Sequence, residues 1–160
     1  MNARDETATV PARGDGADAL RLWLRLLACT NTIESELRAA FRREFASTLP
    51  RFDLMSQLDR HPDGLRMGEL SKRLMVTGGN ITGITDQLAE EGLVSREAPP
   101  DDRRAFIVKL TPSGRALFRR MATVHEHWVS TLFSDLSGND RNELLQLLAK
   151  LRASAKKDYQ

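Results

Sequence analysis

The side chains best suited to chemistry are polar groups in two short stretches near the middle of the chain. Asn80 and Thr82 follow a glycine pair, and Arg104 follows Asp102 by two residues in a charged turn. An asparagine amide can form two hydrogen bonds with the edge of an adenine base, and a threonine methyl can pack against the methyl group of thymine. An arginine at a hairpin tip can enter a narrow, electronegative groove of DNA. The pattern therefore indicates contact with DNA.

Neighbouring residues extend this candidate site. Asp102 can hold the Arg104 guanidinium in a fixed orientation, and a glycine lets a base edge or phosphate come close to the backbone. Each feature also has an ordinary interpretation, such as a solvated polar side chain or an exposed ion pair contributing about 0–1 kcal/mol. The candidate DNA-binding residues are Thr77, Gly79, Asn80, Thr82, Asp102, Arg103 and Arg104, with Lys72 and Arg73 as phosphate contacts.

The hydrophobic pattern assigns these residues to a compact series of elements. Apolar residues at helical spacing predict two short helices, and β-rich runs separated by Pro99-Pro100-Asp101-Asp102 predict a hairpin. The expected elements are a helix over 67–74, a second helix between Thr77 and Gly92, strands over 93–96 and 105–110, and a short strand at 65–66. A helix, a turn, a second helix and a hairpin are the plan of a winged helix-turn-helix.

Longer amphipathic helices are expected on both sides of this motif. The fold class is therefore mainly α with a small β wing, and residues 1–17 are expected to form a flexible tail. The rest, 18–160, is expected to be one domain, with dimerisation helices over 18–46 and 112–160 around a winged helix-turn-helix over 51–111. These helices carry more apolar surface than the small motif can bury, which predicts a homodimer.

Composition excludes several other classes. The chain has 160 residues, a net charge of +2 and one cysteine, with no apolar run long enough to span a membrane. These features favour a cytoplasmic protein, although the small net charge does not by itself argue for a nucleic-acid partner. The single cysteine and three scattered histidines do not suit a metal site. No phosphate-binding loop or nucleophile–base pair is evident, so we expect neither a cofactor nor an enzyme.

Three stretches resemble the MarR family of bacterial transcriptional regulators. LSKRLMVTGGNITGITDQLAEEGLV is similar to the family's turn and recognition helix, and Asp102-Arg103-Arg104-Ala105 to its Asp-x-Arg wing signature. Leu136-Ser137 with the leucine-rich tail resembles its closing dimerisation helix. Gly83 departs from the family, because many members carry a long polar side chain there. This departure bears on base preference rather than on the fold.

The resemblance implies a transcriptional repressor that binds an inverted-repeat operator in double-stranded DNA as a homodimer. It also implies release by a small-molecule effector, either an aromatic carboxylate or its acyl-CoA thioester, as in regulators of aromatic compound catabolism. Arg38, Arg42, Arg43 and Arg51 are candidates for the phosphates of CoA. The residues expected to form the effector pocket, each of which could also be plain core, are Trp23, Arg25, Leu27, Arg51, Phe52, Met55 and Trp128.

Two alternatives remain open. The first is a winged-helix protein-interaction module that binds no DNA. The second is a redox-sensing repressor that responds through Cys29, with Arg25 as the basic neighbour one helical turn away. We expect instead that Cys29 is a small buried residue without a sensing role.

Overall fold

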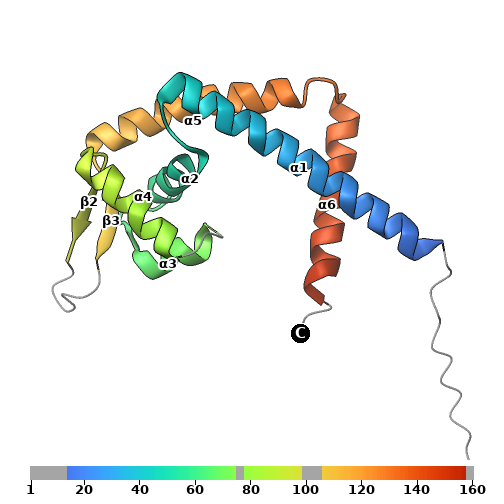
Figure 1. Ribbon diagram of the computed structural model, residues 1–160, viewed down its shortest axis with the longest axis horizontal. Coiled ribbons are helices and arrows are strands. Elements are labelled where there is room, and N and C mark those ends of the chain that lie inside the picture. The colour runs from blue at the N-terminus through green and yellow to red at the C-terminus, as the bar shows by residue number, and fades with distance from the viewer. Residues whose placement is uncertain (1–13, 75–77, 99–105, 158–160) are drawn as a thin grey trace, which may run out of the picture.

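The computed structural model describes residues 14–74, 78–98 and 106–157, which form six helices and three short strands (Figure 1). Two helices precede the central motif, namely α1 (Asp15–Phe45) and α2 (Leu49–Asp59). The motif contains β1 (Leu65–Arg66), α3 (Met67–Arg73), α4 (Gly78–Glu90), β2 (Val94–Glu97) and β3 (Ile107–Leu110). The chain ends with α5 (Pro112–Leu132) and α6 (Gly138–Lys157). The predicted mainly helical fold with a small sheet is confirmed.

The junction between α1 and α2 differs from the sequence-based expectation. The winged helix-turn-helix is expected to begin at residue 51, but its first helix, α2, begins at Leu49, because Thr48 serves as the N-cap and accepts a hydrogen bond from the Arg51 backbone N–H at 3.4 Å. Pro50 lies in the first turn, where its missing N–H leaves no helical hydrogen bond unmade. Ala46 ends α1 in the left-handed conformation at φ 47°, so only three residues separate the two helices.

The three strands form one antiparallel sheet in the order β1-β3-β2. Leu65 pairs with Val108, and Val94 pairs with Leu110. The turn at 61–64 that leads into β1 closes through a hydrogen bond from Gly64 N–H to the His61 carbonyl at 2.8 Å, with Gly64 at φ +90°. This sheet is the predicted wing, with the additional short strand that we expected at 65–66.

The hydrophobic core lies between the last part of α1, α2, the two helices of the motif, the sheet and the first half of α5. Apolar side chains from all of these elements contact one another there. Its fully buried members are Phe41, Leu54, Met55, Leu58, Leu70, Ile81, Leu88, Val108 and Met121. The core therefore belongs to the winged helix-turn-helix and fixes α4 against the rest of the motif.

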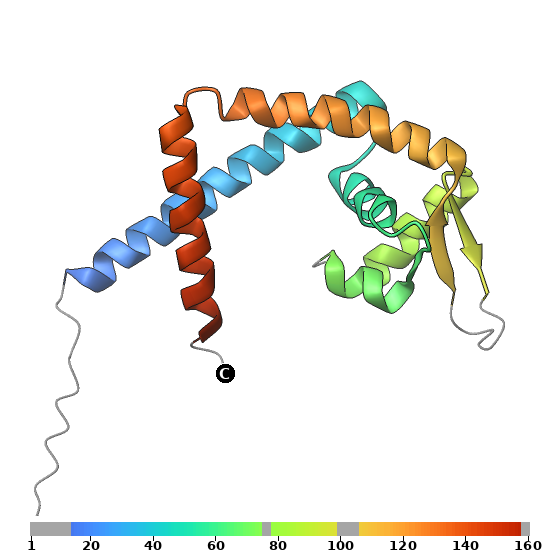
Figure 2. The same ribbon diagram turned by 180° about the vertical axis from the view of Figure 1, so that it is seen from behind.

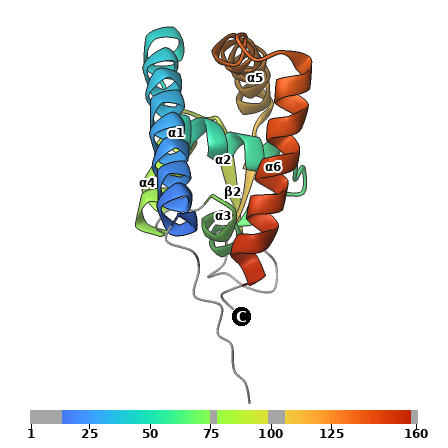
Figure 3. The ribbon, with the colours of Figure 1, turned by 90° about the vertical axis from the view of Figure 1, so that its right-hand side faces the viewer.

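The remaining helices extend away from this core. From the wing, α5 leads to α6, which descends at the end of α5 farthest from the motif (Figures 1 and 2). Viewed from the side, α1 and α6 stand apart, with α2 seen between them (Figure 3). Ser137 and Asp140 cap the start of α6 reciprocally, with N–H to oxygen distances of 2.8 and 3.2 Å.

Candidate nucleic-acid interface

One face of α4 is buried and the opposite face is open to solvent. Ile81, Ile84 and Leu88 are buried in the core, and Thr85 is buried beside them with its hydroxyl donating to the Ile81 carbonyl at 2.8 Å. A rotation of about 100° per residue then directs the other positions outward. Asn80 and Thr82 are both exposed, as the sequence predicts for residues that read DNA bases.

Near the start of α4, the face of the helix that points away from the core carries few large side chains. Helical rotation places Gly83 between Asn80 and Thr82, which flank it on opposite sides. A Cβ atom added to Gly83 would meet no other atom within 4 Å. Farther along the helix, Asp86 forms an ion pair with Arg96 of β2.

The end of α4 is fixed by a glycine in the left-handed conformation. Gly92 has φ +69°. Leu93 N–H bonds to the Leu88 carbonyl at 2.8 Å, and Gly92 N–H bonds to the Ala89 carbonyl at 3.0 Å. These two bonds form a Schellman motif, which satisfies carbonyl groups at the helix end. The direction of the chain from α4 into β2 is therefore well defined.

The two longer strands of the wing are linked by an ion pair between Lys109 of β3 and Glu97 of β2 at 2.7 Å. Asp102, Arg103 and Arg104 at the tip, and Thr77 before α4, lie outside the described residues, so their assignment to DNA contact stays a prediction. Lys72 and Arg73 are exposed in the last turn of α3, where cations also suit the helix dipole.

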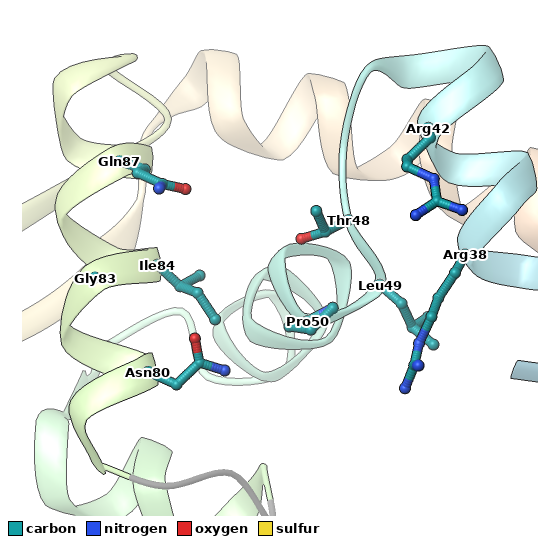
Figure 4. A pocket seen from close by; sticks show the side chains of 9 residues that line it. All are labelled: Arg38, Arg42, Thr48, Leu49, Pro50, Asn80, Gly83, Ile84 and Gln87. Carbon is teal, nitrogen blue, oxygen red and sulfur yellow. The ribbon is translucent and has the colours of Figure 1, made fainter. Parts of the chain in front are cut away.

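A pocket of about 420 Å³ lies between α1, α2 and α4 (Figure 4). Asn80, Ile84 and Gln87 point from α4 towards the first turn of α2, and two arginines of α1 lie on the other side. The pocket combines cations, amides and apolar surface, a set that suits a small organic anion. Its lining residues are Arg38, Arg42, Thr48, Leu49, Pro50, Asn80, Gly83, Ile84 and Gln87.

None of the seven residues expected to form an effector pocket lines this one. Trp23, Arg25 and Leu27 are exposed on the first half of α1, where they belong to the surface that α1 leaves uncovered. Phe52 and Met55 are buried in the core, and Trp128 packs against it, with its ring edge-on to that of Phe41 at 5.1 Å between centroids. Arg51 is largely buried and pairs with Glu91.

The expectation that Cys29 is buried is wrong, because Cys29 is exposed in the single chain. Its position on the first half of α1, which the core of its own chain does not cover, explains the exposure. In the part of the chain that the structure describes, no three His, Cys, Asp or Glu side chains lie together in a way that could hold a metal ion. Within residues 14–74, 78–98 and 106–157, no helix is both long and apolar enough to cross a membrane.

Comparison with known proteins finds the same fold in regulators of transcription. A model of the MarR family matches residues 47–106. The crystal structure of a MarR family transcriptional regulator from Silicibacter pomeroyi superposes with a TM-score of 0.78 at 31% identity, covering 90% of this chain and 99% of that one. Sco3205, a MarR family regulator from Streptomyces coelicolor solved in complex with DNA, has a TM-score of 0.76 at 24% identity over 86% and 88%.

Curated sequences give a similar result over shorter regions. The HTH-type transcriptional repressor YetL of Bacillus subtilis is 33% identical over 107 residues, which is 66% of this chain and 64% of YetL. The chain spans 55–64% of the length of three Bacillus subtilis relatives that it matches, YetL among them.

Proposed function

Because the chain belongs to the MarR family of transcriptional regulators, we propose that it is a repressor whose homodimer binds an inverted-repeat operator and is released by a small organic acid. The observation that carries the proposal is the first half of α4, where Asn80 and Thr82 are exposed beside Gly83 on a helix whose other face is locked into the core. The N-terminal part of a recognition helix is the part that contacts base edges in helix-turn-helix docking.

Pairing of two chains is supported by the apolar surface of α1 and α6. Trp23, Leu24 and several leucines of both helices are exposed, in a protein whose core is otherwise well covered. A second copy that covers these side chains would place two α4 helices on one side of the dimer. Two-fold symmetry then requires an inverted repeat with half-sites about one helical turn apart, roughly 10 base pairs.

An effector site is supported by the pocket between α1, α2 and α4. Arg38 and Arg42 offer charge to a carboxylate, while Leu49 and Ile84 offer apolar contact. A volume of about 420 Å³ suits an aromatic acid, and the CoA part of a thioester would extend outside it. Asn80 lines this pocket and also lies on the exposed face of α4, so a bound acid would compete with a base for the same amide.

DNA binding is tested by fluorescence anisotropy with the DNA upstream of the chain's own gene, titrated with salt. We expect Asn80→Ala to relax base preference at one position by about 1–3 kcal/mol, while Asn142→Ala on the exposed surface of α6 changes nothing. Arg104→Ala should lower the salt slope by about one unit. Equal affinity for the upstream fragment and for a scrambled fragment would contradict the proposal and favour a protein-interaction module.

The effector site is tested by calorimetric titration with aromatic carboxylates and their CoA thioesters. Arg42→Gln should weaken binding of the acid by about tenfold, the effect of losing one charge-assisted contact. For the free acid, Arg43→Gln is the matched control, because Arg43 is the next residue of α1, lies outside the pocket lining and forms an ion pair with its neighbour Glu44 at 3.2 Å. Equal losses in the two variants would show that the acid does not bind in this pocket.

The exposure of Cys29 keeps a redox-sensing repressor as a second candidate. An exposed thiol on a helix at the proposed dimer surface could alter DNA binding when it is oxidised. If peroxide releases the wild type from DNA and Cys29→Ser abolishes that release, thiol oxidation is the signal. If peroxide releases both proteins from DNA equally, Cys29 is not the sensor, and the organic-acid proposal does not depend on it.

A further inference from the structure

An ion pair that is buried on the Arg51 side and half exposed on the Glu91 side joins the first turn of α2 to the end of α4. The guanidinium of Arg51 donates two hydrogen bonds to the carboxylate of Glu91, with Nη1–Oε1 at 2.7 Å and Nη2–Oε2 at 2.5 Å. The Arg51 side chain is only 14% exposed, and that of Glu91 is 48% exposed. These hydrogen bonds from Arg51 lower the pKa of Glu91. A bidentate pair of this kind fixes both distance and orientation between its two elements.

The stability of the individual helices does not explain this pair. Arg51 is the third residue of α2, where the free N–H groups carry positive partial charge, and Glu91 directly follows α4, where the free carbonyls carry negative partial charge. Each charge is therefore unfavourable at the end of its own helix. The only favourable interaction of these two charges is their attraction to each other across the boundary between α2 and α4.

The core gains little from the burial of Arg51. Its Nε atom is buried and has no hydrogen-bond partner among the described residues, which costs free energy. An apolar side chain of similar size would avoid this cost, and buried ion pairs can often be replaced in that way without loss of stability. The contribution that remains is geometric, because the pair fixes α4 relative to α2.

Both ends of the pair stand on rigid supports. Glu91 precedes Gly92, whose left-handed conformation closes the Schellman motif at the end of α4. Arg51 stands one turn after the short connection from α1, in which Ser47 is buried and its N–H bonds to the Phe41 carbonyl at 3.2 Å. A displacement of the end of α1 therefore reaches Arg51, and through Glu91 it reaches α4.

We propose that Arg51 and Glu91 are positioning residues that set the orientation of α4 relative to α1 and transmit effector binding to it, an inference that rests on the proposed function. The pocket lies between the elements that the pair joins, since Thr48, Leu49 and Pro50 line it from α2 and Gln87 lines it from α4 (Figure 4). Gln87 lies one helical turn before Glu91. A ligand that separates these walls acts directly against the ion pair.

Charge reversal tests the proposal. Glu91→Arg removes an unfavourable charge from the end of α4 but sets it against Arg51, so we expect α4 to move and operator affinity to fall about tenfold or more. Arg51→Glu should have the same effect. The double variant Arg51→Glu/Glu91→Arg restores an attractive pair and should recover most of the lost affinity. A role in helix stability alone predicts instead that Glu91→Arg is harmless.

The matched control is another ion pair between elements, Arg115 with Asp59, which joins α5 to α2 at 3.3 Å and does not touch α4. Arg115→Gln should change the melting temperature without changing operator affinity at a temperature well below melting. The proposal would be overturned if Arg51→Glu and Glu91→Arg lose no more operator affinity than Arg115→Gln does. It would also be overturned if the loss persists in the double variant.

A second measurement separates this inference from the proposed function. Amide hydrogen exchange of α4 needs no DNA, and we expect faster exchange in each single reversal and near wild-type exchange in the double variant. A wild type that binds no operator refutes the proposed function alone. Unchanged exchange of α4 in the single reversals refutes the positioning role, whether or not the protein binds DNA.

Discussion

At the scale of single residues, His125 occupies an unusual position for a titratable side chain. Its ring lies 4.7 Å from that of Phe52 and 5.7 Å from that of Phe41, between centroids, where α5 meets α2 and α1. Trp128 completes this aromatic group with an edge-on contact to Phe41. Burial among these rings lowers the pKa of His125 from its ordinary value of 6.5, because a charged imidazolium loses hydration there.

We expect this histidine to make stability depend on pH. The neutral ring is favoured in the folded state, so the unfolded chain binds more protons once the pH falls below about 6.5, and folding weakens. The melting temperature should therefore fall between pH 7.5 and 5.5. Because the ring is partly exposed, solvent screening keeps the effect small.

Thermal melts of two variants check the assignment. His125→Phe keeps an aromatic ring but cannot titrate, so its melting temperature should change less with pH than that of the wild type. His127→Gln removes an exposed histidine of the same helix and should behave as the wild type does. An unchanged pH dependence in His125→Phe would assign the effect to other groups.

At the scale of elements, the start of α5 lies unusually close to the turn between α4 and β2. The Thr111 and Ser113 hydroxyls donate to the Gly92 carbonyl at 2.7 and 3.1 Å. Thr111 N–H bonds to the Leu93 carbonyl at 3.1 Å. A Cβ atom at Gly114 would stand only 1.9 Å from that same carbonyl oxygen. Two segments about twenty residues apart therefore meet backbone to backbone, and Gly114 makes the contact possible.

Two glycine-to-alanine substitutions should have opposite effects on stability. Gly114→Ala must push α5 away from Leu93, and we expect a loss of about 1–3 kcal/mol, as for other overpacked sites. Gly83→Ala meets no neighbour and should gain about 0.5–1 kcal/mol from better helix propensity. Urea unfolding of both variants measures the difference. A stable Gly114→Ala protein would contradict the close contact.

Elements were predictable where their signals are local. Thr111, Ser137 and Gly92 are residue types that favour helix ends, and each caps a helix through groups within about five residues of itself. The start of α2 is ambiguous in the sequence, because a proline such as Pro50 can break a helix or occupy its first turn. That choice depends on the capping hydroxyl of Thr48.

The candidate site was predictable only in part. The exposure of Asn80 follows from the helical period of α4 alone. The pocket brings Arg42 of α1 together with Gln87 of α4, and the ion pair joins residues that lie 40 positions apart. No periodicity in the sequence reports such distant contacts. Cys29 was misjudged for a related reason, because an apolar stripe does not reveal whether its own chain or another covers it.

At the scale of the whole molecule, apolar surface is concentrated far from the core. Leu22 is 61% exposed on α1 and Leu145 is 66% exposed on α6. Every residue of α6 from Gly138 to Lys156 is exposed in the single chain. Monomeric proteins rarely leave so much contiguous apolar surface uncovered, which supports the proposed pairing of two chains through these helices.

We expect Leu145→Asp to dissociate the dimer and with it operator binding. A buried carboxylate in an apolar interface should weaken association by about 2 kcal/mol or more. Gln146→Asp is the control, because its position on α6 is turned away from the leucine face. Sedimentation velocity reports the oligomeric state of both variants. A monomeric wild type, or a dimeric Leu145→Asp, would contradict the proposed pairing.

The exposure of α6 has a consequence for the abundance of the protein in a cell. Most of the stability of a helix in a protein comes from tertiary packing, and in the proposed dimer the second chain supplies the packing that α6 lacks in the single chain. On that proposal, unpaired subunits of a scarce protein would fray at α6 and become substrates for proteases, while paired subunits would be protected. Degradation would then fall most heavily on the unpaired subunits, and the lifetime of the regulator would rise with its own concentration.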